Sequence, residues 1–183
     1  KEVHIHSPKD AKKAGLGFIT EDRKEEGLIL NMDLHTNMGM AILDQLKKGI
    51  GLDLKRESVL MDEYIKSLSI KCRDCNQKAK ALSGGNQQKV VIAKWLATKP
   101  KVLIMDEPTR GIDVGSKNQI YALINDLAKQ GIGIIMISSE LPEVLQVSNN
   151  IVVFAAGKIT GRLENKDLTQ DILLDYATSQ TAV

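Results

Sequence analysis

Three uninterrupted apolar segments occupy the second half of the chain, at residues 102–105, 132–137 and 151–154. Runs of this kind are typical of strands that are buried on both faces of a sheet. Residues 116–129, between the first two segments, place their apolar residues on one helical stripe, and Gly131 follows as a stop signal. A strand, a helix and a strand in succession pair in parallel through a right-handed crossover. The sequence therefore predicts an α/β fold built on a parallel sheet.

Composition excludes several classes of protein. Of the 183 residues, 43% are hydrophobic and 26% are charged, so the chain can bury a core. A formal net charge of +2 and an aromatic content of 3% argue against a nucleic-acid-binding surface. The two cysteines predict a reducing compartment rather than a disulfide framework. The apolar runs are far too short for a bilayer span and the first residues lack a signal-peptide pattern, so we expect neither a membrane-spanning nor a secreted chain.

Strand-like and helical segments divide the chain into two predicted parts. Residues 1–31 and 99–183 carry the strand patterns and are assigned to the sheet core, with a first strand expected at residues 2–6. Residues 32–98 have helical periodicity and are assigned to an inserted helical subdomain. Residues 21–27 are charged and have no hydrophobic period, so they are predicted to form a solvated loop.

The predicted subdomain ends in a helix whose first residues are Ser83, Gly84, Gly85, Asn86 and Gln87. Ser83 is a suitable N-cap, and the two glycines let a ligand approach the backbone closely. The first amide groups of a helix have no partner within it and carry about half a positive charge, so we predict a phosphate-binding site here. The alternative, an ordinary capped helix start, stays open at this point.

Two carboxylates, Asp106 and Glu107, directly follow the apolar segment 102–105. Open α/β sheets bind ligands at the C-terminal ends of their strands. Asp106 is therefore a candidate Mg²⁺ ligand, and Glu107 is a candidate to polarise water in phosphoryl transfer. The tight loop that follows ends at Asp113, which is predicted to face a partner. The alternative is an acidic turn without chemistry, because an Asp-Glu pair by itself carries little information.

These stretches resemble one protein family in their order and spacing. They read LSGGNQQK at residues 82–89 and DEPTRGID at residues 106–113. They are similar to the signature, the Walker B motif and the D-loop of ATP-binding cassette (ABC) ATPases. More narrowly, they resemble the second cassette of the double-cassette ATPases that energise bacterial import of ribose, galactose, xylose and related simple sugars. The resemblance covers nearly the whole chain and implies a partial P-loop NTPase (RecA-like) parallel-sheet core with an inserted helical subdomain.

The resemblance implies that ATP and Mg²⁺ are the ligands. It assigns nucleotide binding to Ser83, Gly84, Gly85, Asn86, Gln87 and Asp113, metal binding to Asp106 and Glu21, and catalysis to Glu107 and Ser139. Two of these positions depart from the family, since Glu21 stands where the family has the Q-loop glutamine and Ser139 where it has the switch histidine. Glutamate still offers an oxygen to a metal or water. Serine can donate one hydrogen bond to a γ-phosphate but lacks the size and charge of an imidazole.

A phosphate-binding loop of the form Gly-x-x-x-x-Gly-Lys-[Ser/Thr] is absent from the sequence. The single Gly-Lys pair, Gly157-Lys158, is followed by Ile159. In the family that loop precedes the Q-loop, so the chain is expected to be a fragment of a longer subunit. Because the loop supplies most contacts to the β- and γ-phosphates, the fragment alone is predicted to bind Mg-ATP weakly and to hydrolyse none.

Partners and location also follow from the resemblance. An opposing cassette would face this one head to tail, integral membrane permease subunits would bind it, and a periplasmic or extracellular sugar-binding protein would act indirectly. No nucleic acid is expected, and the implied location is peripheral, on the cytoplasmic face of the plasma membrane. Two alternatives stay open: a catalytically degenerate half-site that completes the partner's ATP site, and a soluble ABC ATPase without a permease. A DNA-repair or chromosome-organising ATPase is disfavoured, because the segment between Glu21 and Leu82 lacks the sustained heptads of a coiled coil.

Overall fold

The computed structural model describes residues 2–179, and the chain forms two compact units, Lys1–Ile137 and Ser138–Val183. The first unit holds a three-stranded sheet together with the helices of the predicted subdomain, and the second holds a β-hairpin with two helices. The predicted boundaries of the subdomain, at residues 32 and 98, stay predictions.

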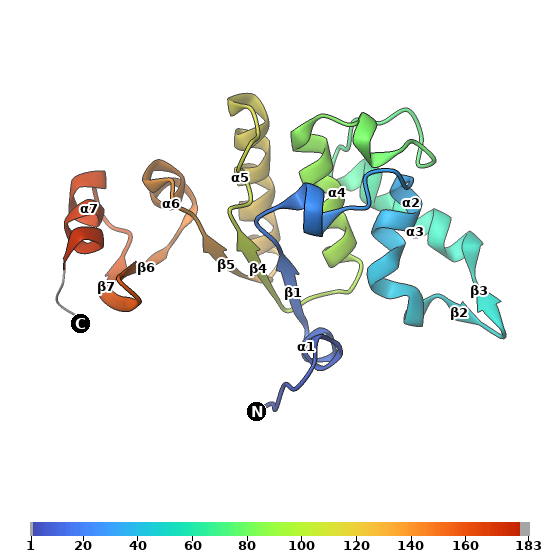
Figure 1. Cartoon of the computed structure of the whole chain (residues 1–183), viewed down its shortest axis with the longest axis horizontal. Helices are drawn as coiled ribbons and strands as arrows, with labels where there is room; N and C mark the ends of the chain where they lie inside the picture. Colours follow the sequence, from blue (N-terminus) through green and yellow to red (C-terminus); the bar gives the residue numbers. More distant parts are fainter. Residues whose placement is uncertain (1, 180–183) are drawn as a thin grey trace. The chain divides into compact units, whose positions relative to one another are not determined.

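A parallel sheet forms the centre of the first unit, as the strand-helix-strand pattern predicted. It has the order β1-β4-β5, with β1 at Leu16–Ile19, β4 at Val102–Asp106 and β5 at Gly133–Ile137 (Figure 1). Phe18 lies opposite Ile104, and Ile104 lies opposite Ile135. Because β1 and β4 are neighbours in the sheet, the whole segment between them is inserted at the carboxyl end of β1.

One face of this sheet is covered by helices. Ile19, Leu103 and Met105 are fully buried on that face, and α4 (Gly84–Leu96) contacts β1 while α5 (Val114–Lys129) contacts β5. α5 ends at Lys129, and the left-handed Gly131, with φ 90°, follows two residues later as the stop signal predicted from the sequence.

The opposite face of the sheet leaves apolar side chains exposed. Phe18 is 43% exposed and Ile135 is 52% exposed, and Ile137 at the end of β5 is similar. The expectation that these apolar segments are buried on both faces is therefore wrong for β5, and β1 is likewise exposed on this face. A continuous apolar run fixes the strand, but burial of each face depends on whether another layer lies against it.

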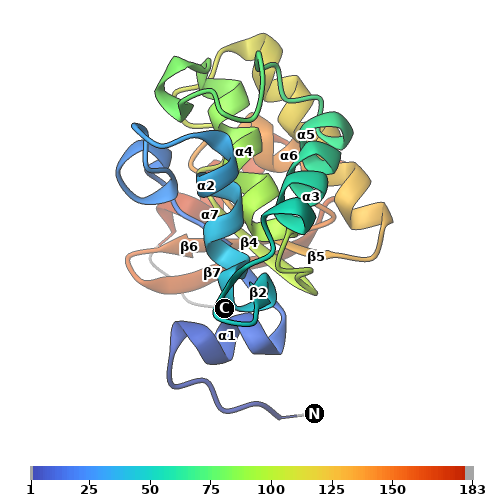
Figure 2. The ribbon, with the colours of Figure 1, turned by 90° about the vertical axis from the view of Figure 1, so that its right-hand side faces the viewer.

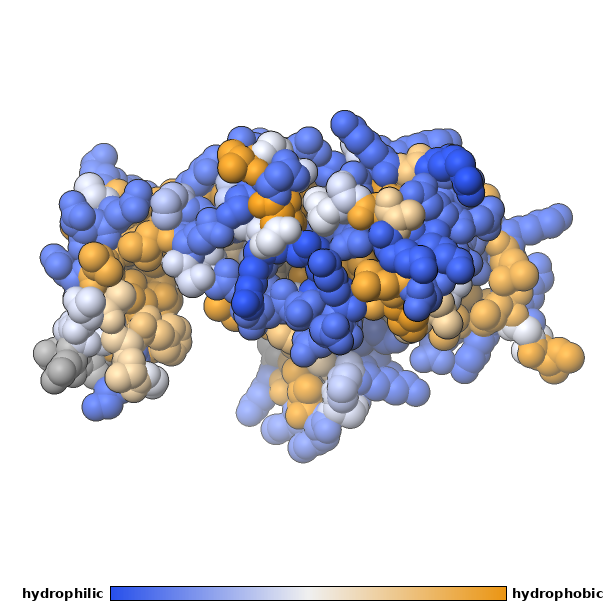
Figure 3. Space-filling model, turned by 45° about the horizontal axis from the view of Figure 1, so that its top comes forward, coloured by the Kyte–Doolittle hydropathy of each residue, from blue (hydrophilic) through white to orange (hydrophobic). Residues whose placement is uncertain are grey.

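Helices between β1 and β4 pack around a second part of the same core. They are α2 (Leu34–Gly39), the 3₁₀ segments Met40–Gln45 and Ala79–Ala81, α3 (Leu54–Ser67) and α4 (Figure 2). Met38 on α2, Met61 on α3 and Val90 on α4 are fully buried. A short hairpin, β2 (Lys47–Lys48) with β3 (Gly51–Leu52), interrupts them, and Ile50 in its turn is exposed. Figure 3 shows an apolar tip at the right of the molecule, the side on which Figure 1 draws this hairpin.

Two segments near the start of the chain differ from their predicted form. Residues 2–6 form no regular element, because alternation alone makes a strand only where another strand pairs with it. The helix that follows, α1 (Pro8–Ala14), begins with Ser7 as its N-cap. The predicted loop at residues 21–27 instead contains a single π-type turn at Arg23–Gly27, which the carboxylate of Asp22 caps by accepting from the amides of the next turn.

The second unit is a hairpin packed with two helices. β6 (Asn150–Ala155) and β7 (Lys158–Glu164) pair antiparallel through a turn with positive φ at its central residues, and α6 (Leu141–Val147) and α7 (Gln170–Thr178) contact each other. β6 alternates between exposed and more buried positions. The prediction that this apolar run is buried on both faces is therefore wrong. Within residues 2–179 no helix has the length and apolar content needed to cross a bilayer.

Candidate functional site

The start of α4 leaves backbone donors available. Its first internal hydrogen bond joins the Gln87 amide to the Ser83 carbonyl at 2.9 Å, and the Ser83 side chain makes no capping bond. Within residues 2–179, the amides of Gly84, Gly85 and Asn86 therefore have no acceptor. Ser83 itself is exposed. Such a helix start presents N–H groups and the positive end of the helix dipole to an anion.

The two glycines of this helix start meet different neighbours. A Cβ on Gly84 would come within 2.9 Å of Nη2 of Arg23 and 3.3 Å of the Gly111 carbonyl oxygen. A Cβ on Gly85 would come within 2.5 Å of the Cβ of Ser116, at the start of α5. Gly85 therefore requires glycine for close packing of α4 against α5, whereas a side chain at Gly84 would displace the guanidinium of Arg23. Gly85 is buried and Gly84 is half-buried.

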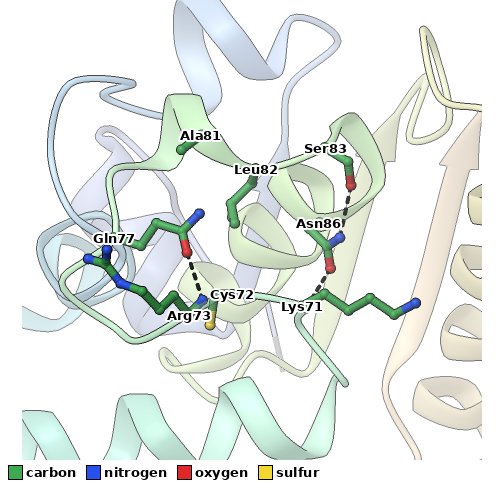
Figure 4. Close-up of a pocket in the computed structure, with 8 residues that line it drawn as sticks. All are labelled: Lys71, Cys72, Arg73, Gln77, Ala81, Leu82, Ser83 and Asn86. Carbon is green, nitrogen blue, oxygen red and sulfur yellow. Dashed lines mark hydrogen bonds between the residues drawn. The ribbon is translucent and has the colours of Figure 1, made fainter.

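Asn86 and Gln87 project in different directions. Asn86 is half-buried and joins the Lys71 amide to the Ser83 hydroxyl beside an open pocket (Figure 4). Gln87 is buried and donates to the Ala79 carbonyl at 3.1 Å, so its side chain lies among the residues that precede the helix. Of the predicted nucleotide contacts in this helix, Ser83, Gly84 and Asn86 reach accessible positions and Gly85 and Gln87 are enclosed.

Asp106 and Glu107 lie where β4 ends, at the carboxyl edge of the parallel sheet. Both are half-buried. Glu107 has a left-handed backbone, with φ 44°, and its amide donates to the Ile137 carbonyl at the end of β5, 2.9 Å away. A non-glycine residue in this conformation costs about 1–3 kcal/mol and persists where neighbouring structure enforces it, often at functional sites. The bond to β5 and the packing of the buried Thr109 hold this turn.

Asp113 caps α5. Its carboxylate accepts from the Ser116 amide at 3.0 Å, and it is exposed. Hydrogen bonds from the Ser116 side chain and amide hold the pKa of Asp113 below its usual range. The Asp113 carboxylate therefore has a structural role as the N-cap of α5. Its contact with a partner stays a prediction.

Glu21 and Ser139 are the two candidate residues that depart from the family's pattern. Glu21 is exposed and forms an ion pair with Arg110, in the loop that follows β4. Ser139 is an exposed residue of the second unit, so it is described within that unit alone. Residues 2–179 contain no cluster of three or more His, Cys, Asp or Glu side chains placed to hold a metal. Mg²⁺ commonly takes one or two carboxylates with the remaining ligands from phosphates and water, so Asp106 fits it without such a cluster.

Arg23 lies in the charged segment 21–27, which was predicted to be a solvated loop. It is only 8% exposed, and its Nη1 and Nη2 donate to the carbonyls of Arg110 and Gly111, at 2.6 and 3.0 Å. Its Nε is buried without a partner in the described chain, and burial lowers the pKa of Arg23. Because its acceptors lie almost ninety positions away, nothing in the charged run around it could identify it.

The sequence of this chain matches a known protein family over most of its first 110 residues. The family model for ABC transporters matches residues 4–110, which is more than half of the chain and includes the helix start at Ser83 and the Asp106-Glu107 pair. This chain belongs to the ABC transporter family. The prediction of an ABC ATPase from the two sequence motifs is thus confirmed at the level of the family.

Relatives of this ABC domain include ribose import ATP-binding proteins named RbsA. The protein from Caldanaerobacter subterraneus subsp. tengcongensis is 52% identical over 172 residues, which are 93% of this chain and 35% of that protein. The protein from Bacillus subtilis is 49% identical over 179 residues, which are 97% of this chain and 36% of that protein. The chain thus spans about a third of the length of these relatives.

Solved structures confirm the α/β fold. A dimeric ATP-binding cassette in a post-hydrolysis state, bound to ADP and Pi, superposes with a TM-score of 0.71 at 21% identity and covers 90% of this chain and 69% of that one. A nucleotide-free cassette from an ABC transporter gives a TM-score of 0.73 at 21% identity, covering 88% of this chain and 66% of that one. At this identity the likeness concerns the fold.

Proposed function

We propose that this chain is part of the second nucleotide-binding domain of an ABC ATPase subunit that couples ATP binding and hydrolysis to import of a simple sugar. The observation that carries the proposal is the start of α4, where three amides and the Ser83 hydroxyl have no acceptor for their protons within residues 2–179. A row of such donors fits the γ-phosphate of a nucleotide held by an opposing cassette. The ribose import proteins named above, at about half identity, support the sugar class.

Within the proposed half-site, the chain's own acidic pair has two tasks. Asp106 would bind Mg²⁺ and Glu107 would orient and polarise the attacking water. When bound, Mg²⁺ neutralises charge on the phosphate oxygens. The bond from the Glu107 amide to Ile137 fixes the backbone that carries this carboxylate. Ser139 would donate to the γ-phosphate, and Asp113 would contact the opposing cassette.

Glu21 has a more restricted part in the proposal. Its carboxylate pairs with Arg110, so it can reach a metal or a water only after it leaves that guanidinium. We propose that Glu21 acts when the segment after β1 moves relative to the loop after β4, with permease subunits at the cytoplasmic face of the membrane as the partners that bind this segment.

The test is transport by the complete subunit. A bacterial strain that has lost its own ribose-import ATPase should regain ribose uptake when it receives the full-length subunit and its cognate permease, and the Glu107→Gln variant should abolish that uptake. Co-purification of the permease subunits would agree with the proposal. Sedimentation of the subunit with ribosomes, with no uptake of any simple sugar, would contradict it and favour an ABC ATPase without a permease.

A second candidate is a half-site that performs no hydrolysis and completes the partner's site. Ser139 at the switch position favours it, because a serine cannot accept and return a proton as an imidazole does. The donors at the start of α4 serve the opposing site in both cases. Unchanged ATP turnover in the full-length Glu107→Gln subunit would identify this candidate.

A further inference from the structure

Asn86 connects two parts of the chain through both ends of its side-chain amide. Its Oδ1 accepts from the backbone amide of Lys71 at 2.7 Å, and its Nδ2 donates to Oγ of Ser83 at 2.8 Å. Both bonds are drawn in Figure 4, where Asn86 lies between the segment at Lys71 and the first residue of the helix. Asn86 is half-buried, whereas Ser83 is exposed.

The direction of these two bonds is fixed by the backbone. A backbone N–H can only donate, so the atom of Asn86 that faces Lys71 must be the carbonyl oxygen. The NH₂ group of Asn86 therefore faces Ser83, and the Ser83 oxygen accepts that bond. A serine hydroxyl that accepts a hydrogen bond still has its own proton to donate. No acceptor for that proton is found within residues 2–179.

Ser7 shows what the same residue type does when the side chain three residues later accepts a hydrogen bond instead of donating one: the Ser7 hydroxyl donates to Oδ2 of Asp10 at 2.7 Å. At the start of α1, the Ser7 oxygen accepts from the Asp10 amide at 3.2 Å, which is the usual arrangement of an N-cap. At the start of α4, Ser83 makes no capping bond to the helix amides. Asn86 thus holds the Ser83 oxygen, and neither the first helix amides nor the hydroxyl proton has an acceptor within residues 2–179.

We infer that Asn86 is a positioning residue that acts through Ser83: it turns the Ser83 hydroxyl into a donor toward an anionic oxygen of the nucleotide across the dimer. The inference rests on the proposed function, in which Ser83 contacts that nucleotide. In this inference Asn86 does not contact the ligand itself. The backbone amide of Lys71 holds the Asn86 side chain in its orientation.

The rival explanation is that Asn86 binds the nucleotide with its second N–H. A double-mutant cycle separates the two explanations, since residues that act as one unit lose activity together and not additively. The full-length subunit, assembled with its permease in proteoliposomes, is prepared as the wild type, Ser83→Ala, Asn86→Ala and the double variant. ATP turnover gives kcat and KM for each.

Each single variant should lower kcat about tenfold, because a hydrogen bond to a charged group is worth about 1.5–3 kcal/mol and 1.4 kcal/mol is tenfold in rate. The double variant should fall no further than Ser83→Ala. KM for ATP should stay within about twofold of the wild type, since the contact forms after the nucleotide is bound by the other cassette. If Asn86→Ala only damaged the structure, it would lower the active fraction of the protein whether or not Ser83 was present. The double variant would then be less active than Ser83→Ala.

Gln77→Ala is the matched control. Gln77 lines the same pocket, is also half-buried, and accepts from the Arg73 amide at 2.7 Å with its side-chain oxygen, but it does not contact Ser83. It should turn over ATP as the wild type does. Asn86→Asp provides a variant of nearly unchanged shape that can accept from Lys71 but cannot donate to Ser83, and it should lower kcat at least as much as Asn86→Ala.

Three results would overturn the inference. Losses that multiply in the double variant would mean that Asn86 contacts the nucleotide by itself. A normal kcat in Asn86→Ala, with a reduced kcat in Ser83→Ala, would mean that Ser83 needs no positioning. A normal kcat in Ser83→Ala would overturn the proposed role of Ser83, and with it this inference, so the two failures are distinguishable.

Discussion

The guanidinium of Arg23 donates to the carbonyl oxygen of Gly111, with 3.0 Å between Nη2 and the oxygen. The same guanidinium donates to the carbonyl of Arg110, and Gly84 lies close enough that a Cβ there would come within 2.9 Å of Nη2. One buried cation therefore joins the turn after β1, the loop after β4 and the start of α4. These are the segments in which the sequence motifs lie.

Arg23→Gln should destabilise the chain. The shorter, neutral side chain cannot reach both carbonyls, and the loss of hydrogen bonds from a charged donor costs about 2 kcal/mol. Urea denaturation should show a lower midpoint with an unchanged slope. Lys24→Gln, at the exposed neighbouring position, is the control and should stay within about 0.5 kcal/mol of the wild type. Equal midpoints for Arg23→Gln and the wild type would contradict a structural role for the buried guanidinium.

Gly85→Ala should also destabilise the chain, for a steric reason. The added Cβ would lie 2.5 Å from the Cβ and 2.6 Å from Oγ of Ser116, so α4 and α5 would have to separate. Overpacking of this kind costs about 1–3 kcal/mol. Gly51→Ala, where nothing lies within 4 Å of the added atom, is the control for urea denaturation. Ser116→Gly in the Gly85→Ala background should restore part of the loss, and no restoration would argue against this contact as the cause.

Asp113 should give a pH-dependent contribution to stability. Its pKa is lowered in the folded chain by hydrogen bonds from Ser116, so the folded state favours the carboxylate. The contribution is therefore complete above about pH 4, the ordinary range of an aspartate, and is lost as the pH falls through the lowered pKa. Asp113→Asn keeps the cap and removes the titration. The difference in urea midpoint between the wild type and Asp113→Asn should shrink below pH 4, and a difference that grows there would contradict the sign.

Glu107→Gln in the full-length subunit should separate binding from hydrolysis. Removal of a general base commonly costs between a hundredfold and ten-thousandfold in rate. ATP turnover should therefore fall by at least about a hundredfold, while the affinity for ATP is retained because the side chain keeps its size. Glu107→Gln should leave the turn after β4 folded, since the bond to Ile137 comes from the backbone.

The chain tested alone should bind Mg-ATP only weakly and hydrolyse none. Its sequence lacks the loop whose amides and lysine would hold the β- and γ-phosphates, and in the proposed function the donors at the start of α4 serve a nucleotide held by the opposing cassette. Isothermal titration calorimetry of the isolated chain with Mg-ATP measures this directly. A dissociation constant in the micromolar range would contradict the prediction.

The start of α4 and the acidic pair could be identified from sequence because each depends on neighbours within a few residues. Ser83 with its two glycines, and Asp106 with Glu107 after an apolar strand, carry local chemistry that the spacing preserves. The position of Gln87 could not be identified in this way. Its burial depends on the Ala79 carbonyl, which the preceding 3₁₀ turn brings beneath the helix.

The parallel strands, the helix between them and the two motifs could be predicted from the amino-acid order, because periodicity and local donors or acceptors are properties of neighbouring residues. Which side chains are buried and which faces are exposed depends on the fold. Arg23 is buried because carbonyls of a distant loop accept its protons, whereas Phe18 is 43% exposed although it lies in an apolar strand. Burial and hydrogen bonding between remote segments depend on contacts between residues that are distant in the sequence, and a local pattern cannot predict these contacts.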